Sequence, residues 1–378
     1  MSEYQVVAFR AVDGPVSAAN LQYMQKQSSR AEITPWSFDN EYDYGDFHGN
    51  AVEMLRRGYD VHLHYANFGI RKLLIRLPHG LPDAEAARPY FGKDSLEFLQ
   101  DKQGSGGTLA IEPSYEPGEL EELYEFDEIL NRLIPLRAEV LNGDLRPLYL
   151  AHLAVNCDEN HDPEETHEAP VPAGLNDLSD AQWALAELYE LSDALIAAAA
   201  KGSPPAATQI DVSEQQAAWI RSRPEATKDA WLVEWVADPS SRVRAEILSE
   251  WRKATSASSW PTVRRNRTIA ELQSAAIEAR REMDANAAGT AALKRAKRLA
   301  DIASDPSQAL RETEQLVKQR NSAAYGKIAK LLTEVRDALA GSNQSQLAEQ
   351  HAQMLVKNNP TLRILVTELR RQGFIPKR

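Results

Sequence analysis

The sequence predicts an α+β N-terminal domain of antiparallel hairpins and short helices, followed by one or more all-α domains, with helix predominating overall. The first observation behind this prediction concerns residues 1–115, where period-two apolar patterns typical of strands alternate with short helical patterns. The second is that the apolar spacing from residue 176 onward is helical. The third is a series of N-cap signatures in that region, such as Ser179 followed by Gln182.

The elements expected before residue 59 follow from local patterns and from residues that start or end helices. Pro35 favours an edge position in the sheet, because proline lacks the amide hydrogen that a central strand must donate. Gly58 follows the last apolar residues of a helical pattern and is a natural C-cap. The expected elements are a strand at 4–12, a helix at 17–28 with Ser17 as N-cap, an extended segment at 31–44 and a helix at 50–57.

The strongest hairpin pattern of the chain lies at 59–66 and 70–77, two apolar runs joined by Asn67-Phe68-Gly69. Alternation places Val61, Leu63 and Tyr65 on one face, and Asp60, His62 and His64 on the other. Antiparallel sheets commonly bury one face only, so we expect the two histidines on the solvent face. A short helix at 82–90 and a second hairpin around the glycines at 104–107 complete this domain.

Four regions follow from changes in composition and spacing along the chain. Breaks rich in Pro, Gly and Ser separate the helical patterns, and 264–302 is expected to form a long exposed helix or a coiled coil. The regions are an α+β domain at 1–115, an acidic helical connector and loop at 116–175, a Trp-rich helical domain at 176–260 and a basic helical hairpin or bundle at 261–378.

The charge of the chain is unevenly distributed. The formal net charge of −12 divides into −21 for residues 1–260 and +9 for residues 261–378. The segment 112–168 alone holds sixteen Asp and Glu against three Arg. Blocks of this kind repel nucleic acid and attract basic partners, which include the basic part of the same chain.

Several classes of protein are disfavoured by composition. No apolar run approaches the roughly 20 residues that span a bilayer, and the N-terminus lacks the pattern of a secretory signal. The single cysteine, Cys157, permits no internal disulfide and fits a reducing compartment, so we expect a cytoplasmic protein without a membrane span. No catalytic motif or cofactor fingerprint is recognised, and we therefore assign no cofactor.

A metal site is one hypothesis for the first hairpin. His62 and His64 lie on one face of a strand, and Asp46 and His48 could join them if the preceding loop folds over that face. Imidazole and carboxylate groups together are suitable ligands for transition metals. The alternative is that both histidines are solvated residues of a half-buried hairpin.

Two basic clusters are candidates for binding phosphates or an acidic partner. Acidic residues such as Glu271 and Glu278 dilute these clusters, so a solvated helix face or a contact with the 112–168 block explains them equally well. The clusters are Arg264, Arg265 and Arg267, and then Lys294, Arg295, Lys297 and Arg298.

Six of the seven tryptophans lie between residues 183 and 260. Trp231 and Trp235 are one helical turn apart, and this pair could line a groove for a partner. The alternative is the core of a small helical domain, because aromatic side chains dominate core packing.

Three segments carry a resemblance to known proteins. SSRAEITPWSFDNEYDYGDFHGN begins at residue 28, YANFGIRKLLIRLP at residue 65 and VPAGLNDLSDAQWALAEL at residue 171. Together they resemble a broad family of bacterial proteins without an assigned function. The resemblance implies a bacterial cytosolic origin and brings no catalytic residue with it.

The function expected from these patterns is that of an interaction protein, an adaptor or assembly subunit whose helical C-terminal half docks a protein partner. One alternative is a factor associated with nucleic acid, for instance in phage defence or DNA maintenance, that binds through the basic clusters. Another alternative is a metal-dependent enzyme that uses Asp46, His48, His62 and His64. The oligomeric state does not follow from the sequence.

Overall fold

The computed structural model divides the chain into two compact units, residues 1–280 and residues 281–378. Each unit has a hydrophobic core of its own. The structure describes residues 3–43, 45–92, 95–115, 123, 125–157, 162–205, 212–237, 243–255 and 260–376. No helix within these ranges is both long enough and apolar enough to cross a bilayer.

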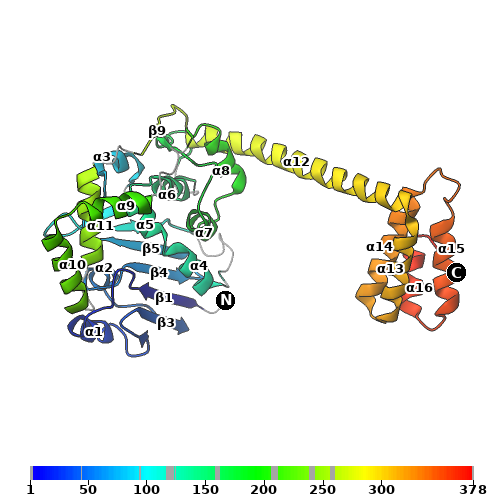
Figure 1. Ribbon diagram of the computed structural model, residues 1–378, viewed down its shortest axis with the longest axis horizontal. Coiled ribbons are helices and arrows are strands. Elements are labelled where there is room, and N and C mark those ends of the chain that lie inside the picture. Colours follow the sequence, from blue (N-terminus) through cyan, green and yellow to red (C-terminus); the bar gives the residue numbers. More distant parts are fainter. Residues whose placement is uncertain are drawn as a thin grey trace. The chain divides into compact units, whose positions relative to one another are not determined.

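An antiparallel sheet of seven strands forms the centre of the first unit (Figure 1). The strand order is β2-β3-β1-β4-β5-β7-β6, and both predicted hairpins form neighbouring pairs in it, β4–β5 and β6–β7. The predicted α+β N-terminal domain is therefore confirmed. The strands are β1 (Tyr4–Arg10), β2 (Glu32–Ile33), β3 (Ser37–Asp43), β4 (Val61–Ala66), β5 (Ile70–Leu77), β6 (Leu96–Gln100) and β7 (Gly107–Ile111).

Helices α1 (Ala18–Gln25) and α2 (Ala51–Arg56) cover one face of the sheet. The Ser17 side chain caps α1 as predicted, and Gly58 follows α2 with a φ of +151° that residues with a Cβ rarely adopt. Met24, Met54 and Leu55 of these helices join Phe9 and Leu74 of the sheet in one buried cluster.

The opposite face of the sheet is covered by the helical segment that follows it in the sequence. The Arg71 side chain donates to the carbonyl of Leu188, and the Tyr189 hydroxyl donates to the carbonyl of Ile111. Residues 116–122 of the predicted acidic connector lie outside the described residues. The helices of this segment are α4 (Phe126–Leu133), α5 (Leu136–Leu141), α6 (Arg146–Asn156), α7 (Asp180–Leu188) and α8 (Asp193–Ala200). The short helix α3 (Ala84–Ala87) and the 3-10 helix η1 (Arg88–Tyr90) lie between β5 and β6 in the sequence, and η1 contacts α6.

The two helical layers correct one expectation from the sequence. His62 was expected on a solvent face, yet it is buried with 1% of its surface exposed, and Asp60 is fully buried. The alternating pattern of β4 therefore separates two cores, one on each side of the sheet, and not a core from water.

A short strand pair anchors the segment before the long helix of the chain. β8 (Val171–Pro172) pairs with β9 (Thr262–Val263), although helices alone were expected beyond residue 176. Strands of two residues carry no detectable period in the sequence, which is why the pair was missed. Beside it, Arg267 forms a bidentate ion pair with the completely buried Glu168 carboxylate.

The segment between Pro204 and Pro261, which we call the α9–α11 excursion, begins and ends beside the β8–β9 pair. The amide of Gly174 donates to the carbonyl of Pro204, and the neighbouring amide of Ala173 donates to the carbonyl of Pro261. The helices of this excursion are α9 (Val212–Arg221), α10 (Glu225–Ala237) and α11 (Val243–Thr255).

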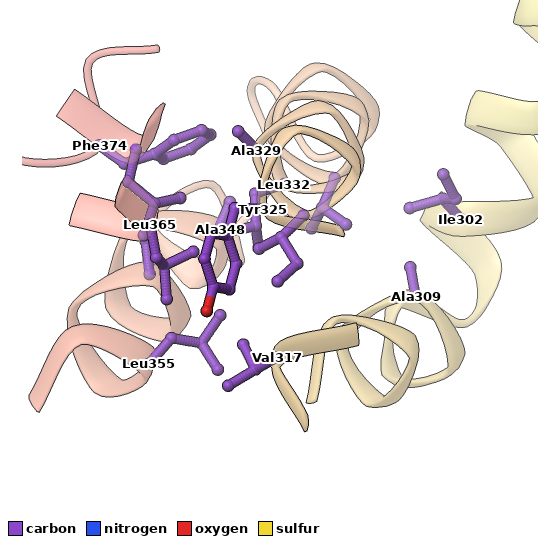
Figure 2. Close-up of a cluster of buried hydrophobic side chains, with 14 of the residues drawn as sticks. Ile302, Ala309, Val317, Tyr325, Ala329, Leu332, Ala348, Leu355, Leu365 and Phe374 are labelled. Carbon is purple, nitrogen blue, oxygen red and sulfur yellow. The ribbon is translucent and has the colours of Figure 1, made fainter. Parts of the chain in front are cut away.

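Helix α12 (Ile269–Ser304) continues from the first unit into the second, and its residues 284–298 are all exposed. The second unit is a bundle whose core includes the fully buried Ile328, Leu332 and Leu365. In Figure 2, the side chains of Tyr325, Leu332, Leu355, Leu365 and Phe374 gather in the space between the helices of this bundle. The remaining helices are α13 (Pro306–Lys318), α14 (Ser322–Ala338), α15 (Leu347–Asn358) and α16 (Arg363–Arg371).

Candidate functional site

The predicted metal ligands are distributed over β4 and the loop that follows β3. His62 and His64 are two residues apart on β4, and their ring centroids are separated by 6.3 Å. Asp46 and His48 are exposed residues of the loop. The described residues contain no group of three or more His, Cys, Asp or Glu side chains placed to hold a metal ion.

His62 is held in the core as a neutral side chain. Its ring stacks on Phe9 at 4.1 Å, and its Nδ1 lies 3.0 Å from the carbonyl oxygen of Ala8. A carbonyl can only accept, so Nδ1 carries the proton. Burial lowers the pKa of His62 well below its ordinary value, and the neighbouring His64 adds to this effect.

His64 ends a short chain of hydrogen bonds that begins at Asp46. The Gln5 amide nitrogen donates to Asp46 Oδ1 at 2.9 Å and to the carbonyl of Gly45. The Gln5 oxygen is thereby left to accept from His64 Nε2, also at 2.9 Å. Burial and the charge of Lys72 lower the pKa of His64 to about 4, against the opposing effect of Asp46. The arrangement holds a neutral imidazole in one orientation.

The first basic cluster divides into residues with different surroundings. Arg267 is engaged with Glu168, which also accepts a hydrogen bond from the Tyr149 hydroxyl. The Arg265 side chain packs so closely on Gly202 that a Cβ there would overlap its guanidinium. Arg264 is exposed. The cluster therefore does not present three free guanidinium groups together.

The second basic cluster is partly neutralised by helix α14. Arg295 pairs with Asp337 at 2.7 Å, and Arg298 pairs with Glu334 at 2.6 Å. The hydrogen bond that Arg298 donates to Glu334 is also the main reason why the pKa of Arg298 is raised. The lysines of this cluster, Lys294 and Lys297, are exposed.

The two tryptophans of the predicted groove have different surroundings. Trp231 is half-buried, and its ring stacks on Trp219 of α9 with centroids 6.1 Å apart. The guanidinium of Arg223 lies 4.5 Å from the centroid of the Trp219 ring. Trp235 is 64% exposed.

Helix α10 exposes a continuous group of apolar side chains. It has no buried residue along its 13 positions. Sequence reasoning singled out only the tryptophans, but the signal was present in the run Trp-Leu-Val-Glu-Trp-Val-Ala at 231–237. The exposed residues are Leu232 (58%), Val233 (67%), Trp235 (64%) and Val236 (76%), which we call the α10 apolar patch.

Buried donors without partners accompany this patch. Within the described part of the chain, the indole nitrogens of Trp219 and Trp251 and the Nε of Arg223 are buried and make no hydrogen bond. A buried donor of this kind costs about 1–3 kcal/mol of stability. In the described part of the sheet, the Oγ1 of Thr108 in β7 is likewise buried without a hydrogen bond.

Two open depressions lie beside helix α4, and acidic residues outnumber basic ones in the lining of both. Their volumes are about 770 and 900 Å³, and Glu128 contributes to both. Arg10 and Arg132, which also line them, are paired with carboxylates. This part of the surface disfavours anionic ligands.

Comparisons with protein-family models, with curated proteins and with solved structures found no match to the chain. The geometry of the chain itself therefore has to support any proposal about its function.

Proposed function

We propose that this chain is an interaction protein, an adaptor or assembly subunit, that docks a protein partner through its helical C-terminal half. The docking element is helix α10. The observation that carries the proposal is the α10 apolar patch, in which four neighbouring large apolar residues are each more than half exposed. Contiguous exposed apolar surface of this kind commonly marks an interaction site.

The energetics of the patch favour a protein partner. Burial of apolar surface contributes about 25 cal/mol for each Å² removed from water, so covering a tryptophan and three aliphatic side chains supplies several kcal/mol. Tryptophan is also the residue type most enriched among those that dominate binding energy at protein interfaces. Trp235 is accordingly the expected centre of the contact.

The polar clusters support other functions less well. Burial lowers the pKa of both His62 and His64, and each imidazole is hydrogen-bonded within the fold. Arg267, Arg295 and Arg298 are engaged with carboxylates. Each of these groups would have to give up a partner before it could bind a ligand. The α10 apolar patch is already exposed and loses no such interaction.

A pair of double variants tests the proposal. Leu232→Ser with Trp235→Ser removes the patch, while Ile277→Ser with Trp36→Ser removes side chains of matched type and exposure elsewhere, 57% and 52% exposed. We expect the full-length protein, purified from its native host after crosslinking, to retain a stoichiometric protein partner. The control should keep this partner and the patch variant should lose it. Recovery of the same partner from both variants would refute the proposal.

A further inference from the structure

The apolar side chains of α10 form a stripe on one side of the helix. At about 100° per residue, Leu232, Trp235 and Val236 fall within roughly one third of the circumference. Trp231 is turned toward α9, where it stacks on Trp219. A straight stripe of this width on a convex helix is the surface against which a second helix packs, at an axial distance of about 8–10 Å.

Acidic residues border this stripe. Glu225 and Asp229 are one helical turn apart, both are exposed, and they lead along the helix toward Leu232 and Val233. Glu234 is also exposed, but it lies on the side of the helix opposite the stripe. The one lysine of the helix, Lys228, is half-buried. The N-terminal end of the stripe therefore carries two exposed carboxylates and one half-buried lysine.

The charge of the whole first unit has the same sign. Residues 1–280 contain 45 Asp and Glu against 26 Lys and Arg, a net charge of −19. A field of this size repels an acidic partner and accelerates the approach of a basic one. It also opposes the close approach of two copies of this unit.

From the stripe and its charge, we infer that the partner of α10 is an amphipathic helix whose apolar side is flanked by Lys and Arg. This inference rests on the proposed function and adds the chemistry of the partner to it. Apolar residues of the partner cover Leu232, Trp235 and Val236, and its basic residues lie against Glu225 and Asp229. The apolar contact sets the affinity, and the charges select the partner and its orientation.

Designed peptides provide the test. The first is an 18-residue Leu/Lys helix with a single apolar stripe, the second replaces every Lys by Glu, and the third has the Leu/Lys composition in an order without a stripe. Fluorescence anisotropy of each labelled peptide is measured with the full-length protein. We expect the Leu/Lys helix to bind, and the other two peptides to bind at least tenfold more weakly.

Protein variants locate the binding of the Leu/Lys helix. Leu232→Ser with Trp235→Ser should weaken it at least tenfold, while the matched pair Ile277→Ser with Trp36→Ser should leave it unchanged. Glu225→Lys with Asp229→Lys should weaken it severalfold and reduce its dependence on salt. Circular dichroism checks that each variant is folded.

Three results would overturn the inference. The first is equal binding of the Leu/Lys helix to the patch variant, which would show attraction by charge alone. The second is preferential binding of the Leu/Glu helix. The third is self-association of the unmodified protein that the patch variant abolishes, which would show that a second copy covers α10. If the crosslinked partner is still lost from the patch variant, the proposed function stands while its stated chemistry fails.

Discussion

The interior around the sheet and the α9–α11 excursion differ in which side chains they bury and which they leave exposed. Around the sheet, charged groups are buried and paired: Arg137 contacts Asp13 and Asp60, and all three side chains are at most 3% exposed. In α9–α11, apolar groups are exposed and buried donors lack partners. Paired charges thus stabilise the interior of the first region, and the exposed apolar side chains of the second region are the surface on which the proposed docking role depends.

The largest effect is expected when the buried ion pairs of the first region are broken. Arg137→Met leaves two carboxylates buried without their cation, so the free energy of unfolding should fall by about 3–5 kcal/mol. Arg132→Met is the matched control, because Arg132 pairs with the exposed residues Asp180 and Glu187, and it should cost less than about 1 kcal/mol. Urea denaturation measures the free energy of unfolding of both variants. Similar losses in the two variants would remove the distinction between buried and exposed pairs.

The next effect concerns pH and the buried imidazole of His64. Its pKa is about 4 in the folded protein and about 6.5 when unfolded, so the unfolded state binds the proton first as the pH falls. The stabilisation is complete above pH 6.5 and is lost progressively toward pH 4, by about 3 kcal/mol in all.

His64→Gln removes this titration. Unfolding free energies measured between pH 7.5 and pH 4 should therefore fall more steeply for the unmodified protein than for the variant. Parallel pH profiles would mean that burial and the charge of Lys72 do not lower the pKa of His64 in the folded protein.

A smaller loss of stability is expected when either of two tryptophans is replaced by Phe, because only one of their indole nitrogens donates a hydrogen bond. Trp260 donates to the carbonyl of Ala173, whereas Trp251 Nε1 is buried without a partner among the described residues. Trp260→Phe should therefore destabilise the protein by about 1 kcal/mol more than Trp251→Phe, which removes an unsatisfied donor. Thermal unfolding of the two variants gives the comparison, and the reverse order would contradict it.

The smallest effect on stability is expected at the α10 apolar patch. Leu232→Ser with Trp235→Ser replaces exposed side chains and should change the free energy of unfolding by no more than about 0.5 kcal/mol. The same double variant is expected to abolish partner binding. A large loss of stability would instead assign these residues to the core of the first unit.

Local patterns predicted most of the fold. The turn Asn67-Phe68-Gly69, the N-cap at Ser17 and the helix end at Gly58 each depend on residues close in sequence, and the structure confirms them. The burial of His62 could not be predicted this way, because it depends on how helices α1 and α2 pack over the face of the sheet that carries Phe9 and His62.

The candidate site was less accessible to sequence reasoning. An apolar run such as 231–237 indicates a helix whose apolar side chains are to be buried, but it does not reveal whether they pack against the same chain or against another molecule. The pairing of Arg295 and Arg298 with α14 is equally non-local, because it joins residues about 40 positions apart. A charge cluster counted from the sequence therefore overstates the charge available to a ligand.

The hydrogen bonds of Gly174 and Ala173 to Pro204 and Pro261 have a consequence for how this protein can change over time. They bring together the two points at which the α9–α11 excursion leaves and rejoins the rest of the chain. A segment with adjacent ends can be lengthened, shortened or exchanged without rerouting the strands beneath it. The α9–α11 segment is therefore the part of the first unit in which changes in length or sequence are expected to disturb the sheet least.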